Sequence, residues 1–227
     1  MNHLRLFNLI LIFLLAFSYY SQDEKRLALV IGNANYEKGA LKNPVNDALL
    51  MARTLDTLGF DVILDTNLET KRGFRNKISE FGNRRPNYDV AFVYYAGHGV
   101  QVNNQNYLLP TKEEFKSEFD VEDFGVSVQM IIRYLTSITN QVNVLILDAC
   151  RDNPFESTWQ TTRSLAGAGL AKMQAPAGSM IAFSTTAGNT APDGNGENST
   201  YCQVLTENML VEGINLDQVF NKHNKPS

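Results

Sequence analysis

The sequence predicts an α/β fold, a three-layer sandwich in which helices cover both faces of a mostly parallel central sheet. From residue 26 onward, apolar strand-like runs alternate with segments of helical periodicity, which is the pattern of successive βαβ units. Strands buried on both faces read as continuous Val, Ile and Leu runs, and the strand-like runs here have that character. The chain has 227 residues, 44% of them hydrophobic, which suffices for one sizeable core.

The first half of the chain predicts two strands and two helices in alternation. Residues 26–33 form an apolar strand that Gly32 ends. Asn43 and Pro44 then begin a helix through residue 58, and Gly59 ends it. Its apolar residues recur at helical spacing: Val45, Leu49, Ala52 and Leu55. A second strand at 60–64 and a second helix at 70–82 follow.

The second half continues the alternation but contains two longer interruptions. Apolar runs predict strands at 88–95, 142–148 and 180–184, the first of them followed by a Gly-rich loop at 96–99. Helices are predicted at 127–136, 202–210 and 216–222. Segments 156–177 and 193–200 are rich in small and polar residues and are predicted as long surface loops.

The composition excludes several classes of protein. A formal net charge of -4 and a charged fraction of 19% argue against a nucleic-acid surface, which needs clustered Lys and Arg. The two cysteines, Cys150 and Cys202, form neither a disulfide framework nor a Cys-x-x-Cys zinc pattern. No metal site is therefore expected, and Cys150 is a lone thiol that is either inert or reactive.

The N-terminus is predicted to be separate from the fold. His3 and Arg5 precede an apolar run at 6–17, and these are the parts of a secretory signal peptide. The run is shorter than the roughly 20 residues of a membrane-spanning helix. We therefore expect residues 1–22 to be a signal peptide and 23–227 the mature domain, exported to the periplasm or the medium without a stable membrane span. The alternative is an uncleaved N-terminal membrane anchor.

Two predicted strands bring reactive side chains to the same edge of the sheet. One ends in YYAGHG, which contains His98, and another ends in LDACRD, which contains Cys150. A thiol becomes a strong nucleophile when a neighbouring imidazole helps to deprotonate it. Alone, either residue is more simply a buried thiol or a loop histidine. Together at matching strand ends they favour catalysis, because ligands bind beyond the carboxyl ends of parallel strands.

Three motifs resemble those of the caspase-like cysteine peptidases, and in particular the bacterial metacaspase and orthocaspase group. The YYAGHG and DACRD segments keep the family spacing of a Cys with a His about 50 residues upstream. Asp148 stands where the caspase signature has Gln, and Asp152 where it has Gly. Segments 31–36 and 41–48 resemble the opening motif of the metacaspase group. The likeness runs from about Arg26 to Phe220.

The resemblance implies a caspase-like fold and a cysteine endopeptidase. By position, His98 is the general acid and base, Cys150 the nucleophile, and the N–H groups of Gly99 and Cys150 the oxyanion hole. Asp47 and Asp148 match the two acids that select Arg or Lys before the cut, which suits charge pairing. Two alternatives stay open. Asp47 could instead be an acid on the surface or in the first turn of its helix, where the helix dipole favours negative charge. Asp148 could instead orient the loop that follows its strand.

Some features of the sequence depart from the family pattern and limit how far the family's properties apply to it. Asp152-Asn153-Pro154 replaces the His-Ser-Gly of eukaryotic metacaspases. The sequence requires no cofactor, and calcium dependence stays open because no Asp-x-Asp-x-Asp-Gly loop is present. Related chains continue past the equivalent of Lys222, so the sequence is expected to be a fragment or to end early.

Two other functions are alternatives to the peptidase. The first is a catalytically silent caspase-like interaction module, although such modules typically lack the His or the Cys. The second is a flavodoxin-like ligand-binding domain, which would have a Gly-rich phosphate loop where this chain has residues 32–35. The sequence predicts neither the natural substrate nor the oligomeric state.

The loop at 156–177 is a candidate for self-cleavage. It follows Cys150 closely and contains Arg163 and Lys172 among small residues that are not expected to pack into a core. Exposed loops are where proteolytic nicking concentrates. We expect cuts after Arg163 or Lys172, and the alternative is that the loop is only a tolerated insertion.

Overall fold

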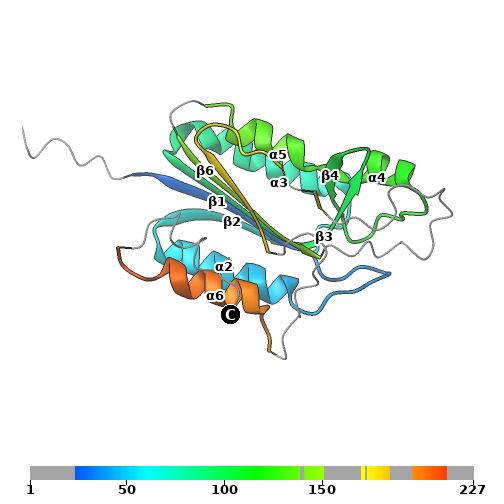
Figure 1. Ribbon diagram of the computed structural model, residues 1–227, viewed down its shortest axis with the longest axis horizontal. Helices are drawn as coiled ribbons and strands as arrows, with labels where there is room; N and C mark the ends of the chain where they lie inside the picture. The colour runs from blue at the N-terminus through cyan, green and yellow to red at the C-terminus, as the bar shows by residue number, and fades with distance from the viewer. Residues whose placement is uncertain (1–23, 139–140, 151–169, 172, 185–195, 214–227) are drawn as a thin grey trace, which may run out of the picture.

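A seven-stranded sheet forms the centre of the protein (Figure 1). The computed structural model describes residues 24–138, 141–150, 170–171, 173–184 and 196–213. Five of the strands are parallel and lie in the order β2-β1-β3-β6-β7. Their bounds are Arg26–Gly32 for β1, Phe60–Thr66 for β2, Val90–Val102 for β3, Val142–Cys150 for β6 and Ser179–Phe183 for β7. The mostly parallel sheet that the sequence predicts is therefore confirmed.

Helices cover both faces of this sheet. Helices α2 (Pro44–Thr57) and α6 (Thr200–Met209) lie side by side on one face. Helices α3 (Lys71–Arg84) and α5 (Val128–Leu135) lie on the other (Figure 1). The three-layer α/β sandwich is confirmed by this arrangement.

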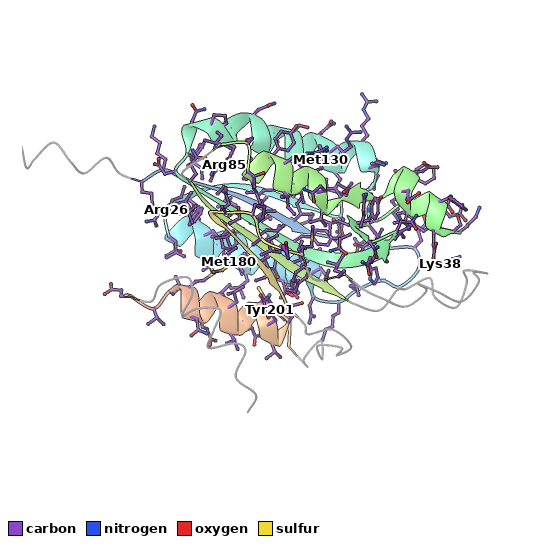
Figure 2. The ribbon with its side chains drawn as sticks, turned by 45° about the horizontal axis from the view of Figure 1, so that its top comes forward. Arg26, Lys38, Arg85, Met130, Met180 and Tyr201 are labelled. Carbon is purple, nitrogen blue, oxygen red and sulfur yellow. The ribbon has the colours of Figure 1, made fainter. Side chains whose placement is uncertain are left out.

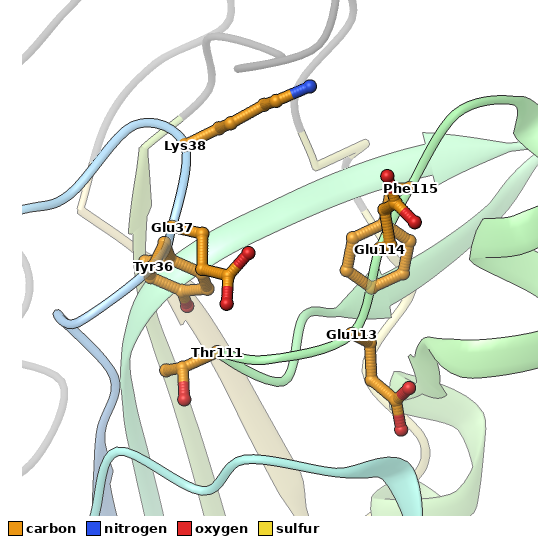
Figure 3. Close-up of a pocket in the computed structure, with 7 residues that line it drawn as sticks. All are labelled: Tyr36, Glu37, Lys38, Thr111, Glu113, Glu114 and Phe115. Carbon is orange, nitrogen blue, oxygen red and sulfur yellow. The ribbon is translucent and has the colours of Figure 1, made fainter.

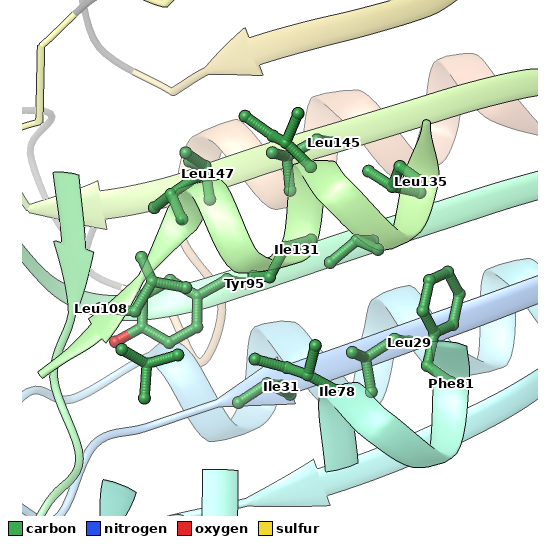
Figure 4. Close-up of a cluster of buried hydrophobic side chains, with 14 of the residues drawn as sticks. Leu29, Ile31, Ile78, Phe81, Tyr95, Leu108, Ile131, Leu135, Leu145 and Leu147 are labelled. Atoms are coloured by element: carbon green, nitrogen blue, oxygen red, sulfur yellow. The ribbon is translucent and has the colours of Figure 1, made fainter. Parts of the chain in front are cut away.

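The core is divided by the sheet into two clusters of buried side chains. Successive residues of a strand point to opposite faces, so Leu29 and Ile31 of β1 pack with Ile78 and Phe81 of α3 (Figure 4). Val30 packs on the opposite face, in the cluster that includes residues of α2 and α6. Both faces of β1 are buried, which explains why its sequence is a continuous apolar run.

Strand β3 is longer than the sequence predicts, and the expected loop at 96–99 is wrong. The strand continues to Val102, turns back at Asn103 and Asn104, and pairs antiparallel with β4 (Gln105–Leu108). Both asparagines have positive φ, 49° and 61°, as the central residues of a tight hairpin turn do. The pair of asparagines was a signal for this hairpin, but the glycines around His98 suggested a loop.

The structure contains two further short elements, a helix and a strand, that the sequence does not predict. Helix α4 (Glu118–Phe124) begins with a capping box between Ser117 and Asp120. Strand β5 (Val126–Ser127) pairs antiparallel with β4. Both were absent from the expected elements because they are too short for a periodic pattern.

A buried arginine links β3 and β6 at the end of the sheet where both strands begin. Arg85, in the short 3-10 turn η1 (Arg85–Asn87), is fully buried. Its guanidinium donates to the carbonyl of Tyr88, just before β3, and at 2.8 Å to Asn143 Oδ1 on β6. Arg85 lies at the opposite end of the molecule from Lys38 in the loop after β1 (Figure 2). This buried side chain links the starts of β3 and β6, the two strands that carry His98 and Cys150.

The loop predicted at 156–177 is partly packed into the core, which corrects one expectation. Leu170 is 2% exposed and belongs to the cluster that α3 and α5 cover. Arg163 and Lys172, the proposed self-cleavage sites, lie outside the described residues. So do the predicted signal peptide at 1–22 and the predicted helix at 216–222. Among the helices that the structure describes, none is long and apolar enough to cross a membrane.

Candidate active site

His98 and Cys150 are opposite one another in the sheet. The parallel pairing of β3 with β6 runs from Val90 and Val142 to a last pair made of His98 and Cys150. Paired Cα atoms on neighbouring strands lie roughly 4.8 Å apart. Residues distant in the sequence therefore become neighbours at the carboxyl edge of the parallel sheet, where ligands bind in such folds.

The His98 ring is held by a main-chain carbonyl. His98 is 4% exposed, and its Nε2 lies 2.6 Å from the oxygen of Gly39 in the loop after β1. A carbonyl oxygen can only accept a hydrogen bond, so Nε2 carries a proton and the neutral ring has its lone pair on Nδ1. Nδ1 is buried and has no hydrogen-bond partner among the described residues. The ring is therefore able to take up a proton at Nδ1.

Burial and the Gly39 carbonyl act on His98 in opposite directions. Burial lowers the pKa of the imidazole from its usual 6.5, and the hydrogen bond to Gly39 raises it by a smaller amount. The net lowering of the pKa keeps the ring neutral near pH 7, as a general base requires. Nothing in the sequence indicated Gly39, because a carbonyl acceptor can come from any residue type.

Gly99 directs its main chain toward the strand that carries Cys150. Gly99 pairs with Leu108 of β4, and the Leu109 N–H donates to the His98 carbonyl at 3.1 Å. Because such bonds alternate along an antiparallel pair, the N–H of Gly99 faces away from β4 and toward β6. A Cβ on Gly99 would lie 2.8 Å from the Leu170 side chain, so a larger residue would need that side chain to shift.

Asp47 is a buried acid in the first turn of α2, which excludes the alternative of a surface residue. It is 2% exposed and lies on the buried stripe of the helix with Met51 and Leu55. Its Oδ1 accepts hydrogen bonds from Asn198 Nδ2 and Ser199 N, both at 2.9 Å. The carboxylate of Asp47 therefore binds the start of α6.

Asp148 lies on β6, two residues before Cys150. Its Oδ2 accepts hydrogen bonds from the Tyr94 hydroxyl at 2.8 Å and the Ser199 hydroxyl at 3.5 Å. Burial raises the pKa of Asp148 to about 6, against the opposing effect of the hydrogen bonds from Tyr94, Ser184 and Ser199. The negative charge of Asp47 raises this pKa further, as expected for two acids that share one region.

Ser199 joins the two acids and was missed in the sequence. Its N–H bonds Asp47, its hydroxyl bonds Asp148, and its Oγ accepts the Cys202 N–H at 3.1 Å as the N-cap of α6. An Asn-Ser pair just before a helical pattern is a cap signal that could have identified it. The two predicted pocket acids are thus brought together by the start of one helix.

Cys202 is a core residue of α6. It is fully buried, and its Sγ donates to the main-chain oxygen of Asp47 at 3.5 Å. Burial raises the pKa of this thiol well above its usual value. A neutral, buried thiol is a poor nucleophile, so Cys202 is not a candidate for that role.

A pocket lies between the loop after β1 and the segment before α4 (Figure 3). It is lined by residues of the loop after β1 and of the segment before α4: Tyr36, Glu37, Lys38, Thr111, Glu113, Glu114 and Phe115. It contains none of the predicted site residues. In the described parts of the chain, no three His, Cys, Asp or Glu side chains gather as potential metal ligands.

Comparison with known proteins gives one family and two relatives. The family described as the caspase domain matches residues 25–225. The human mucosa-associated lymphoid tissue lymphoma translocation protein 1 is 31% identical over 137 residues, which is 59% of this chain and 16% of the relative. Its mouse homologue is 29% identical over 137 residues. The match thus spans about one sixth of the length of these relatives.

Proposed function

This chain belongs to the caspase-domain family, and we propose that it is an active cysteine endopeptidase that cuts after Arg or Lys. The observation that supports the proposal most is the β3–β6 register, in which His98 and Cys150 are the paired residues. The buried His98 ring, held at Nε2 by Gly39, suits the role of a base acting through Nδ1. The motifs favour the bacterial metacaspase and orthocaspase branch, since Asp precedes the Ala-Cys pair.

The proposed reaction has two stages. In the first, Nδ1 of His98 takes the thiol proton of Cys150, and the thiolate attacks the carbonyl carbon of the residue before the scissile bond. The imidazolium then protonates the leaving amine as the C–N bond breaks, and a thioester remains. In the second, His98 takes a proton from water and the resulting hydroxide attacks the thioester. The C–S bond then breaks, the acid product forms, and the Cys150 thiolate takes the proton back from the His98 imidazolium.

Main-chain groups stabilise the charges that develop. The N–H groups of Gly99 and Cys150 are proposed to donate to the oxyanion of each tetrahedral intermediate. The Gly39 carbonyl, 2.6 Å from Nε2, stabilises the imidazolium that forms when His98 is protonated. Both effects depend on positions fixed by the fold before substrate binds.

Asp47 and Asp148 are proposed to select the basic residue. Ser199 bonds both carboxylates, so two acids lie within reach of one polar group at the start of α6. A pocket with two carboxylates attracts a guanidinium or ammonium group and repels an acidic side chain.

A peptide panel tests this function. Fluorogenic peptides that differ only in the last residue, Arg, Lys or Asp, are incubated with the purified chain in calcium and in chelator. We expect cleavage after Arg and Lys, and the two conditions determine whether calcium is needed. Efficient cleavage after Asp would contradict the proposed specificity. No cleavage under any condition would favour the silent interaction module.

Cleavage of the Arg peptide is expected to fall as the pH is lowered through about 6. The pKa of Asp148 is raised to about 6, so its carboxyl group loses its charge in that range and attracts Arg less. The pKa of His98 is lowered by burial, so its ring stays available as a base to lower pH than usual. The measurement is kcat/KM for the Arg peptide between pH 5 and 8.

The Asp148→Asn variant supplies the control for this pH dependence. Its residual activity should lack the decline near pH 6. Stability gives an independent readout, because the folded-state pKa of Asp148 lies above its usual 3.8. The stability contributed by this group is complete below about 3.8 and is lost as the pH rises through about 6. The Tm of the wild type relative to Asp148→Asn should therefore fall between pH 4 and 7, and a constant difference would argue against the raised pKa.

A further inference from the structure

We propose that Tyr36 and Tyr95 are positioning residues whose two hydroxyl groups hold the main chain of His98. The inference rests on the peptidase function proposed above, because it assigns these tyrosines to the histidine of that site. Tyr36 comes from the loop after β1 and Tyr95 from β3 itself. Both are buried, with 6% and 0% of their surface exposed.

The two hydroxyls contact the two main-chain polar groups of His98. The His98 N–H donates to the Tyr36 hydroxyl at 2.9 Å, and the Tyr95 hydroxyl donates to the His98 carbonyl at 2.7 Å. The hydroxyls also lie 3.2 Å from each other. The N–H and the carbonyl of His98 are therefore each bonded to one of two neighbouring tyrosine hydroxyls, in the part of β3 where glycines flank His98.

Gly97 provides the space for this arrangement. Its φ is 153°, and a Cβ built there would lie 2.6 Å from the Tyr95 hydroxyl and 2.8 Å from that of Tyr36. The space that a side chain would take at Gly97 is thus occupied by the tyrosine hydroxyls.

Tyr36 also supports the His98 ring. The two rings pack with centroids 4.4 Å apart at an angle of 52°. The same loop supplies the Gly39 carbonyl that bonds Nε2. One short segment thus fixes the main chain of His98 through a hydroxyl, one face of its ring through packing, and one ring nitrogen through a carbonyl.

The two tyrosines are not equivalent, which gives the proposal a rank order. The His98 carbonyl has a second donor, the Leu109 N–H at 3.1 Å. The Tyr36 hydroxyl is the acceptor that the structure gives for the His98 N–H. Removal of the Tyr36 hydroxyl leaves a buried N–H to be satisfied elsewhere, so His98 must shift. Removal of the Tyr95 hydroxyl leaves the carbonyl bonded to Leu109.

Phe substitutions test the proposal, since they remove the hydroxyl and keep the ring. We expect Tyr36→Phe to lower kcat by roughly 10- to 100-fold with KM nearly unchanged, the size of effect that a shift of about 1 Å produces. Tyr95→Phe should have a smaller effect on kcat. Tyr107→Phe is the matched control and should retain wild-type kinetics, because that hydroxyl bonds only Gln105 Oε1 at 3.3 Å among the described residues.

The position of the ring is measured separately from activity. Imidazole nitrogen shifts in the NMR spectrum report which nitrogen of His98 carries the proton, and they should change in Tyr36→Phe and remain constant in Tyr107→Phe. Wild-type kcat and shifts in Tyr36→Phe would overturn the proposal, as would equal losses in all three variants. If the wild type cleaves no peptide, the proposed function fails, while the shift comparison still decides whether Tyr36 positions His98.

Discussion

Peptide cleavage is expected to fall by at least about 10³-fold in Cys150→Ala and also in His98→Ala. Cys150→Ala removes the proposed nucleophile, so no thioester can form. His98→Ala removes the proposed base that accepts the thiol proton and the acid that protonates the leaving amine. Because the two groups act as one unit, the double variant should lose little more than either single variant. The measurement is kcat/KM for the Arg peptide.

Thiol labelling provides the control for this result. Iodoacetamide should modify Cys150 in the folded wild type and leave Cys202 unmodified, because Cys202 is fully buried and its pKa is raised. His98→Ala should slow the labelling of Cys150, whereas its circular dichroism spectrum should match that of the wild type. Undiminished cleavage by either single variant would remove the pair from the mechanism.

Asp47→Asn and Asp148→Asn are each expected to lower kcat/KM for the Arg peptide by roughly 10²- to 10³-fold. This is the range for removing one partner of a buried, hydrogen-bonded charge pair. Labelling of Cys150 by a small alkylating agent should change far less, because that reaction does not use the basic side chain. The contrast between the two measurements separates loss of substrate binding from damage to the nucleophile.

The matched control for Asp47→Asn is Asp56→Asn. Asp56 lies on the same helix, α2, but is exposed to solvent. The substitution makes the same change in charge without touching α6, so it should leave cleavage unchanged. Asp47→Asn keeps an oxygen that can accept from Asn198 and Ser199, so α6 should remain in place. Equal losses in the two variants would mean that Asp47 acts only through the net charge.

The sequence by itself predicted the fold class and the edge of the sheet at which His98 and Cys150 meet. Strands that are buried on both faces are nearly continuous apolar runs, so β1 and the middle of β6 could be recognised from their sequences. Parallel strands end at a common edge, so residues that follow two such strands come together wherever the strands are neighbours. His98 and Cys150 are paired for this reason.

The sequence was less informative where a local pattern competed with tertiary packing. The glycines on both sides of His98 favoured a loop, but Val100 and Val102 are buried and β3 continues through them. In α2, the sequence predicts an apolar series of Val45, Leu49, Ala52 and Leu55. Ala52 and Leu55 are buried as predicted, but Ala48 and Met51 are buried in place of Val45 and Leu49. A helix with apolar residues around much of its surface does not reveal which face is covered.

The contacts that hold the site could be identified only in the tertiary structure. The Gly39 carbonyl bonds His98, the Tyr36 hydroxyl bonds its N–H, and Ser199 bonds Asp47 and Asp148. These contacts join residues far apart in the chain, and carbonyls and hydroxyls occur in every segment of it. Sequence periodicity indicates which side chains are buried, because burial selects apolar residue types. It does not indicate which polar groups form hydrogen bonds with one another, because those contacts depend on how the helices, strands and loops pack together.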